Sequence, residues 1–343
     1  MISKELFGTT KEGKNVDLYR LTNSKGNYVE VINYGCRIRA ICIKDVNQEL
    51  QNVCLGYDKV ADYERDTCFI GAAIGRCGNR IAGAEFELNG KVFSITKNEK
   101  GNHLHGGKKH FGNQLWKVYI NEDKLVCRKR FDDGAEGYPG NLDVEITYEW
   151  TDENRLIIQY EAMTTDDTLV NLTNHTYFNL SGNAKNTILD HQIKIMADYY
   201  TPVDEYQIPV GMIRDVKNTP FDFREFKKIG DCMDLNDEQL RIGKGYDINY
   251  AFGSSSMKEM AVLQCKDTGI QMTCYSDQPG IQLYTGNNLD DCTENDSGFE
   301  RYTALCLETQ NYPDAIHHHK FPSPILRRGD VYQTTTIYAF ENV

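Results

Sequence analysis

A single carboxylate near the C-terminus is the residue of this sequence that most needs a chemical explanation. The run from Thr303 to Gln310 is apolar and strand-like, and Glu308 lies at its end, directly before Asn311-Tyr312-Pro313-Asp314. Partial burial disfavours the charged carboxylate and raises its pKa toward the working pH of a general base. A structural role, in which Glu308 caps the strand, fits the same position, because structural networks also shift pKa values.

Four further segments carry polar side chains that a strand pattern does not require. They are residues 75–80, 102–107, 170–179 and 243–250. In the third segment, Asn, His and Tyr stand where a strand would carry apolar side chains, so they must bond to each other or to a ligand. Asn, Arg, His, Asp, Gln and Glu together donate and accept hydrogen bonds, and Trp116 and several tyrosines offer stacking surfaces. This composition predicts a pocket for a small, neutral, polyhydroxylated molecule.

Each polar candidate also has a structural explanation when it is considered alone. Arg80 can pair with an acidic neighbour, His175 can be a core histidine bonded to a nearby asparagine, and Asp247 can cap a loop. Asn79 and His105 can hold turns, and Gln282 can bond to neighbouring backbone groups. No single motif decides between a binding site and a scaffold.

Strands are the elements that must position these groups. Leu142 to Trp150 alternates apolar and polar residues without a break, which indicates a half-buried antiparallel strand. Similar runs occupy residues 28–34, 91–96, 155–163, 191–200, 248–252, 260–265, 270–275, 280–284 and 330–340. The helical candidates, residues 57–63 and 236–240, are short. We predict one all-β domain over residues 1–343, built as a sandwich or a closed barrel.

Composition excludes several classes of partner. The net charge is 38 − 50 = −12, which argues against nucleic-acid and anionic-membrane partners. The N-terminus lacks a signal-peptide core and no apolar run approaches a membrane span, so a cytoplasmic protein is expected. The eleven cysteines are scattered singly, which predicts free buried thiols and no thiol metal site. His317, His318 and His319 are expected on a surface loop, where only adventitious metal binding is foreseen.

The polar segments, taken together and in this order, resemble the aldose 1-epimerase (galactose mutarotase) family. The matching stretches are residues 74–82, 102–107, 136–140, 170–180, 199–204, 279–287 and 305–315. The resemblance covers nearly the whole chain. It implies a large antiparallel β-sandwich of the galactose mutarotase type with a few short helices, and an open cleft on one sheet.

The resemblance also implies the activity and the site. Glu308 would be the general base and His175 the general acid that open and reclose the ring of a free hexose such as glucose or galactose. Substrate hydroxyls would be bound by Asn79, Arg80, His105, Asp247 and Gln282. No cofactor and no metal are implied, the partner is a monosaccharide, and the protein is expected to be a monomer or a homodimer. A bell-shaped pH profile follows from one acid and one base.

Other functions stay open at this point. The substrate can be another aldose or a hexose 6-phosphate, although the net charge disfavours a phosphorylated sugar. A sugar-binding protein without catalysis is the alternative from another class. The chain has Cys77-Gly78 and Ile248 where family members commonly carry other residues, and we expect these differences at the pocket margin. His103 is expected to be structural.

Overall fold

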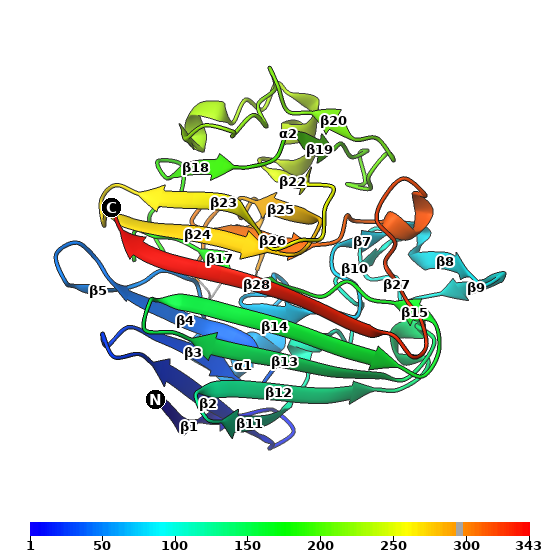
Figure 1. Ribbon diagram of the computed structural model, residues 1–343, viewed down its shortest axis with the longest axis horizontal. Coiled ribbons are helices and arrows are strands. Elements are labelled where there is room, and N and C mark those ends of the chain that lie inside the picture. Colours follow the sequence, from blue (N-terminus) through cyan, green and yellow to red (C-terminus); the bar gives the residue numbers. More distant parts are fainter. Residues whose placement is uncertain (293–297) are drawn as a thin grey trace.

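The computed structural model describes residues 1–292 and 298–343, and strands dominate it. The largest sheet has nine antiparallel strands (Figure 1). In spatial order they are β11 (Lys117–Asn121), β12 (Lys124–Phe131), β13 (Leu142–Trp150), β14 (Arg155–Thr164), β28 (Val331–Asn342), β24 (Ile270–Ser276), β23 (Lys258–Cys265), β18 (Gln192–Ile195) and β21 (Lys227–Lys228). The C-terminal strand β28 therefore lies in the middle of this sheet, between β14 and β24.

Two smaller antiparallel sheets lie behind the large one in the view of Figure 1. One is the meander β1 (Ile2–Thr9), β2 (Asn15–Thr22), β3 (Tyr28–Ile32), β4 (Arg37–Lys44) and β5 (Leu50–Asn52). The other has six strands in the order β17 (Tyr177–Phe178), β26 (Leu305–Gln310), β25 (Gly280–Tyr284), β22 (Asp247–Ala251), β19 (Tyr199–Thr201) and β20 (Arg214–Asp215). This six-stranded sheet carries the candidate site.

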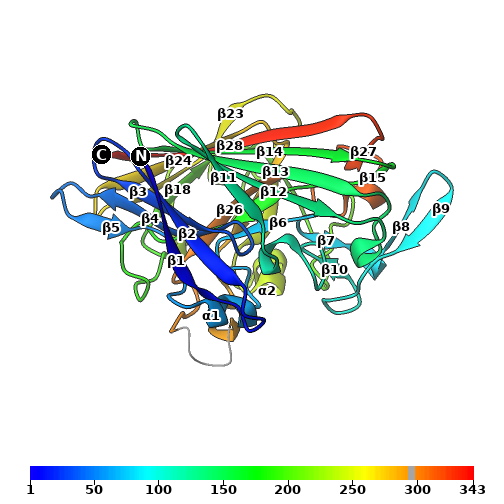
Figure 2. The same ribbon diagram turned by 90° about the horizontal axis from the view of Figure 1, so that it is seen from below.

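Short paired strands and two α-helices complete the fold of the described residues. The pairs are β6 (Ala72–Ile74) with β16 (Thr173–His175), β7 (Arg80–Ile81) with β10 (His103–Leu104), β8 (Glu85–Leu88) with β9 (Lys91–Ser94), and β15 (Thr168–Leu169) with β27 (Ile325–Leu326). The helices are α1 (Val60–Arg65) and α2 (Glu238–Gly243). The β8–β9 hairpin projects from one end of the molecule, and both termini lie at the opposite end (Figures 1 and 2). Within the described ranges, neither helix has the length and apolarity needed to cross a bilayer.

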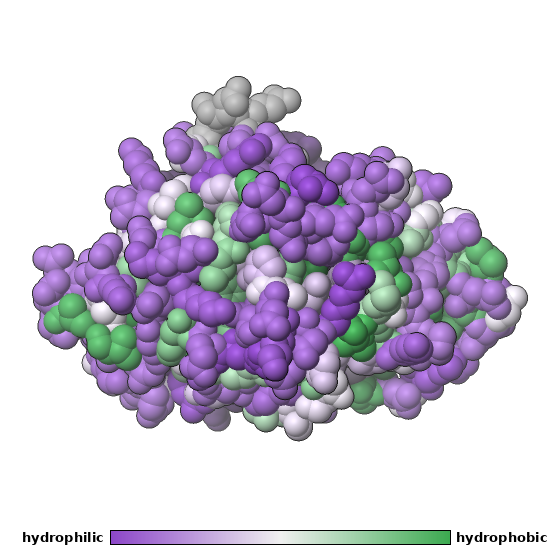
Figure 3. All heavy atoms as spheres, turned by 90° about the horizontal axis from the view of Figure 1, so that it is seen from above, coloured by the Kyte–Doolittle hydropathy of each residue, from purple (hydrophilic) through white to green (hydrophobic). Residues whose placement is uncertain are grey.

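The main hydrophobic core lies between the large sheet and the two smaller ones. Its largest cluster includes Val29 from the meander, Ile146 from the large sheet and Leu283 from the six-stranded sheet. Alternation produces this layer, because every second side chain of each strand points to the same face. The layers are those of the predicted antiparallel sandwich. The face seen in Figure 3 is mostly hydrophilic, with apolar residues scattered over it in small groups.

The predicted strands match the structure closely, with one exception. The runs at residues 142–150 and 280–284 have the bounds of β13 and β25. The run at residues 191–200, expected as one strand, divides into β18 and β19. Ile195 pairs with β23 in the large sheet, whereas Tyr199 pairs with β22 in the six-stranded sheet. The chain changes layers between these residues, which an unbroken run of strand-forming residues does not reveal.

Candidate active site

Alternation along three neighbouring strands gathers the polar groups on the outer face of the six-stranded sheet. On β26, Leu307 packs in the inter-sheet core, so Glu308 points to the other face. Glu308 is paired across the ladder with Gln282 of β25, which in turn faces Asn249 of β22. Asp247 lies two residues before Asn249 and therefore on the same face. One sheet surface thus presents Glu308, Gln282 and Asp247 side by side.

A second wall stands over this surface and carries the histidines. His175 ends β16, and its Nε2 lies 3.7 Å from Glu308 Oε1. Asn79 and His105 are both in the left-handed region, with φ of 59° and 49°. His105 N donates to Asn79 O (3.0 Å), and Asn79 N donates back to His105 Nδ1 (3.1 Å). This reciprocal pair fixes the orientation of the His105 ring.

Arg80 and Asp247 lie at the other end of the pocket. Arg80 Nε is 3.3 Å from Glu99 Oε2, and its Nη2 donates to Gln207 Oε1 (2.8 Å). Gln207 Nε2 donates to Asp247 Oδ2 (2.6 Å), while Gln282 Nε2 donates to Asp247 Oδ1 (2.6 Å). The cation and the carboxylate are therefore joined through the Gln207 amide, and each carboxylate oxygen keeps a lone pair for a ligand.

The segment that follows α1 forms one rim of the pocket, and a buried ion pair anchors it. Arg37 Nη1 lies 2.5 Å from Asp66 Oδ2, and neither side chain is exposed to solvent. Asp66 also accepts hydrogen bonds from the backbone N–H groups of Cys68 (3.0 Å) and Ile70 (2.9 Å). Phe69 is thereby held with φ of 59°. Its ring centroid lies 4.7 Å from that of His105, and we infer that it limits water access to the histidines.

A disulfide between Cys68 and Cys292 ties the same rim to the segment after β25. The two Cα atoms are 5.0 Å apart. This corrects the expectation that all the cysteines are free thiols; the other nine are free. The partners are separated by 224 residues, and their spacing in the sequence carries no signal of the pairing.

Burial dominates the electrostatics of the acid–base pair. It raises the pKa of Glu308 well above its usual value, and the nearby Asp247 carboxylate raises it further. Burial lowers the pKa of His175 to about 3, and it lowers that of His105 well below its usual range. Burial therefore favours the neutral form of each group, the protonated carboxyl of Glu308 and the neutral imidazole of His175. Glu308 Oε2 is buried without a hydrogen-bond partner among the described residues, so it is free to bond a ligand.

The hydrogen bonding of His105 decides between a hydroxyl site and a metal site. His105, His175 and Glu308 offer ligand atoms within 4.8 Å of one another, a set that can hold a metal ion. A metal-bound histidine usually donates its second ring N–H to a neighbouring acceptor. His105 Nδ1 instead accepts from Asn79 N, so its proton is on Nε2. His105 thus offers the pocket a donor, which suits a hydroxyl or ring oxygen and opposes metal ligation.

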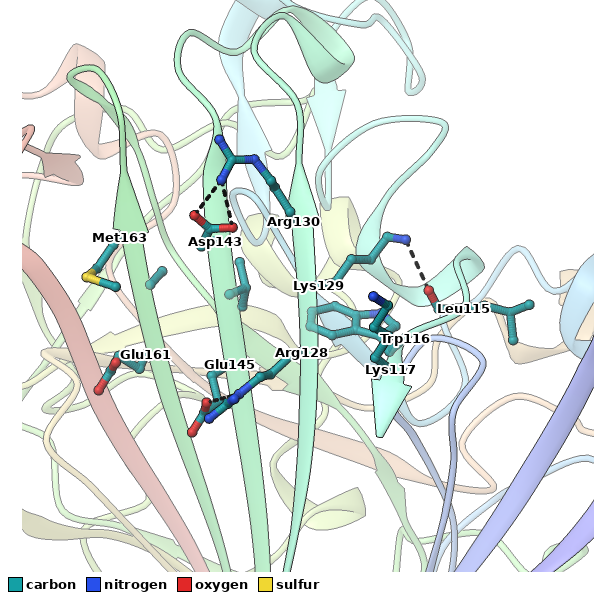
Figure 4. Close-up of a pocket in the computed structure, with 12 residues that line it drawn as sticks. Leu115, Trp116, Lys117, Arg128, Lys129, Arg130, Asp143, Glu145, Glu161 and Met163 are labelled. Atoms are coloured by element: carbon teal, nitrogen blue, oxygen red, sulfur yellow. Dashed lines mark hydrogen bonds and ion pairs between the residues drawn. The ribbon is translucent and has the colours of Figure 1, made fainter. Parts of the chain in front are cut away.

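A larger hollow, of about 690 Å³, lies on the outer surface of the nine-stranded sheet (Figure 4). Four of its charged groups are already paired with each other: Arg128 Nε is 2.5 Å from Glu145 Oε2, and Arg130 Nη1 is 3.0 Å from Asp143 Oδ2. Lys129 Nζ donates to the Leu115 carbonyl (3.0 Å). The acid–base groups lie instead in the cavity of about 150 Å³ over the six-stranded sheet. That cavity is the candidate active site.

The structure brings all the predicted site residues together. Six of them line the cavity, and Gln282 adjoins it through Asp247. The six are Asn79, Arg80, His105, His175, Asp247 and Glu308. Sequence reasoning did not identify Phe69, Glu99 or Gln207 as parts of the site. Their contacts with Arg80, Asp247 and the histidines join distant parts of the chain, so no local pattern indicates them.

Two sequence expectations about the pocket are wrong. Trp116, suggested as a stacking surface, is buried in the core beside Phe111 and Phe131. The aromatic residues that line the cavity are Phe69, Tyr177 and Tyr284. Ile248, expected at the pocket margin, packs in the inter-sheet core, because it alternates with Asp247 and Asn249 on β22. The difference from other family members at position 248 therefore does not alter the lining of the pocket.

Other histidines have structural contacts. His103 is fully buried, and both its ring nitrogens are occupied, by Thr96 O (2.6 Å) and by Tyr138 OH (2.8 Å). His317 and His319 are exposed, as expected of a surface loop, and His318 is partly buried. His317 Nδ1 lies 2.6 Å from the buried carboxylate of Asp314, which raises the pKa of that histidine.

Comparison with known proteins agrees with this geometry. A family model described as aldose 1-epimerase matches residues 17–339. The chain is 37% identical over 343 residues to the galactose mutarotase of Homo sapiens, covering 99% of this chain and 98% of that protein. It is 33% identical over 337 residues to the aldose 1-epimerase of Escherichia coli (strain K12), covering 96% of each.

Solved structures give the same relationship. The galactose 1-epimerase of Lactobacillus acidophilus NCFM superposes with a TM-score of 0.88 at 26% identity, covering 100% of this chain and 99% of that chain. An aldose epimerase homologue from C. elegans has a TM-score of 0.87 at 28% identity, covering 94% and 98% of the two chains. The sandwich, the cavity and these relatives agree, and the chain belongs to the aldose 1-epimerase family.

Proposed function

We propose that this protein is an aldose 1-epimerase that interconverts the α and β anomers of free hexoses such as glucose and galactose. The observation that carries the proposal is the 3.7 Å separation of His175 Nε2 from Glu308 Oε1 inside a cavity with hydroxyl-binding groups. A neutral monosaccharide is the proposed partner. A cytoplasmic monomer or homodimer is the form that composition and resemblance predict.

The reaction needs one proton acceptor and one proton donor. Ring opening removes the proton of the anomeric O1, breaks the bond between C1 and O5, and delivers a proton to O5. Moving the single proton of the pair from Glu308 to His175 prepares Glu308 to accept from O1 and His175 to donate to O5. Rotation about C1–C2 then exposes the other face of the aldehyde, and the two roles reverse during ring closure.

The binding groups divide between the two ends of the sugar. The His105 Nε2–H group stabilises negative charge that develops on O5. Asp247 accepts hydrogen bonds from hydroxyls remote from C1, and Gln282 donates to them. Both residues contribute to affinity in the ground state as well as in the transition state.

Charge at the remote end favours a neutral sugar over a hexose 6-phosphate. Arg80 is the only cationic side chain lining the cavity among the described residues, and Glu99 already pairs with it. Asp247 adds a further acidic group at this end. A phosphate there would meet repulsion without an unpaired cation. A sugar-binding protein without catalysis would not need the buried acid–base pair.

Polarimetry of freshly dissolved α-glucose and α-galactose tests the proposal. We expect the protein to accelerate the decay of optical rotation well beyond the buffer rate, without added metal or nucleotide. An unchanged decay, measured with protein whose fold is verified by circular dichroism, would exclude the activity. Binding of the sugars without acceleration would favour the non-catalytic alternative.

The pH profile of kcat/KM is expected to have a broad plateau across neutral pH. The pKa of His175 is lowered to about 3. The pair, which already carries one proton, therefore takes up a second one only as the pH falls toward that value. Glu308 has a raised pKa, so the pair loses its proton only as the pH rises through that higher value. Polarimetry from pH 4 to 10, corrected for the spontaneous rate, measures both limbs. An acid limb near pH 6.5, with the fold intact, would contradict the buried state of His175.

A further inference from the structure

We propose that Cys306 is a positioning residue that holds the neutral imidazole of His175 as its Nδ1–H tautomer, so that the Nε2 lone pair faces Glu308. The inference rests on the proposed function, in which His175 must take up a proton at Nε2. The observation that carries it is the contact of 3.4 Å between Cys306 Sγ and His175 Nδ1. Cys306 and His175 are 0% and 4% exposed, so bulk water does not compete for this nitrogen.

One strand supplies a partner to each nitrogen of the His175 ring. Cys306 and Glu308 are two residues apart on β26 and therefore point to the same outer face of the six-stranded sheet. Positions two residues apart on a strand are separated by about 6.7 Å, which is enough to bracket an imidazole. Cys306 Sγ meets the ring at Nδ1, and Glu308 Oε1 meets it at Nε2, 3.7 Å away. The two nitrogens therefore have different neighbours, a thiol and a carboxyl group.

Aromatic packing keeps the ring in this orientation. The ring centroids of Phe69, His105 and Tyr177 lie 5.8, 5.1 and 4.9 Å from that of His175. The backbone is held as well, because the carbonyl of His175 accepts from the N–H of Gly71 (3.0 Å). The ring is thus fixed in place, and the hydrogen bond made by one nitrogen decides whether the other carries the proton.

The reaction assigns the proton of the neutral ring to Nδ1. Burial favours a protonated Glu308 and a neutral His175, and the pair must then pass the carboxyl proton to the ring. In that step the O–H bond of Glu308 breaks and an N–H bond forms at Nε2, so Nε2 must hold a lone pair beforehand. Nδ1–H therefore donates to Cys306 Sγ. Burial lowers the pKa of His175, and the residue's own backbone carbonyl opposes this effect, as an acceptor of a ring N–H does.

A thiol orients the ring without making it strongly basic. Burial, together with the nearby Glu308, raises the pKa of the Cys306 thiol well above its usual value, so this partner stays neutral. A carboxylate in the same place would stabilise the imidazolium and raise the pKa of His175. Because the acceptor is weak and neutral, protonated His175 remains a strong acid, as the delivery of a proton to O5 requires.

Two substitutions test the contact. Cys306→Ser keeps a neutral acceptor for Nδ1–H, whereas Cys306→Ala removes it and lets the proton move to Nε2. Cys265→Ala is the matched control, because it removes a free thiol from another buried position, on β23 in the nine-stranded sheet. Circular dichroism establishes that each variant folds.

Polarimetry of α-glucose gives the kinetic result. We expect Cys306→Ala to lower kcat by about tenfold or more. The KM for glucose should change by less than about threefold, because Cys306 is not among the residues that line the cavity. Cys306→Ser should keep kcat within about threefold of wild type, and Cys265→Ala should match wild type.

Nitrogen-15 NMR of protein labelled at histidine reads the tautomer directly, because protonated and unprotonated ring nitrogens have different chemical shifts. The signals of His175 are identified by their loss in His175→Asn. At neutral pH and without sugar, we expect Nδ1 to carry the proton in wild type and in Cys306→Ser, and Nε2 to gain it in Cys306→Ala. Loss of packing alone would not move the proton between the nitrogens.

The outcomes separate this inference from the proposed function. A folded wild type that leaves the decay of optical rotation unchanged for every aldose overturns the proposed function, whereas the NMR spectra still decide the tautomer. An active wild type with the proton on Nε2 overturns the inference alone. The role of Cys306 is equally overturned if Cys306→Ala keeps the wild-type kcat, or if Cys306→Ser or Cys265→Ala loses as much activity as Cys306→Ala.

Discussion

Replacing Glu308 by glutamine should reduce kcat for mutarotation by about 10²- to 10⁴-fold, the usual contribution of a positioned acid–base group. The amide has almost the shape of the carboxyl group but can neither hold nor release the proton that the pair must move. Because Glu308 is buried, solvent has little access with which to replace it. Decay of the optical rotation of α-glucose, corrected for the spontaneous reaction, measures the loss.

Glu87→Gln is the control for this substitution, since Glu87 is an exposed residue of β8 in the outlying hairpin. We expect it to leave kcat at the wild-type value. A Glu308→Gln protein that is folded and within threefold of wild type would remove Glu308 from the mechanism. A large rise in KM without loss of kcat would instead assign Glu308 to binding.

Replacing Asp66 by asparagine should lower the free energy of unfolding by about 3–5 kcal/mol, because it leaves the buried Arg37 guanidinium without its counter-charge. Both side chains of the pair are at 0% exposure, so water cannot solvate the orphaned cation. Arg37 would keep hydrogen bonds to the carbonyls of Gly112 (2.9 Å) and Ile70 (2.8 Å), which do not neutralise it. Denaturant titration monitored by circular dichroism measures the change.

The same substitution should also impair the site, because Asp66 anchors the rim that carries Phe69. We expect a lower kcat/KM even at temperatures where the variant is folded. Asp62→Asn is the matched control: it breaks the exposed pair with Arg65 in α1 and should cost less than about 1 kcal/mol. If Asp66→Asn proves as stable as Asp62→Asn, the buried pair does not stabilise the fold as argued.

Period-two patterning predicted an all-β domain, either a sandwich or a closed barrel, and the family resemblance implied the sandwich. Knowing that Glu308 and Leu307 must point to opposite faces is enough to place Glu308 outside the core. The same rule applied to β22 shows that Ile248 cannot share the pocket with Asp247, so that error was avoidable from the sequence. The resemblance to a family supplied the set of residues, which no single motif decided.

Features that depend on distant pairing lay beyond sequence reasoning. Gln207 is 127 residues from Arg80, which it contacts, and the turn that presents it looks like any polar loop. The partners of the disulfide are still further apart. Trp116 was misplaced because its type suits stacking on a sugar as well as packing in a core, and only tertiary contacts separate the two.

The central place of β28 has a consequence for the order in which the molecule is made. Strands β14 and β24 flank it on both sides, so the large sheet stays in two halves until β28 has left the ribosome. The pocket wall that bears His175 is complete much earlier than the strand that bears Glu308. A nascent chain therefore exposes the unpaired edges of β14 and β24 until β28 emerges, a stage at which aggregation competes with folding.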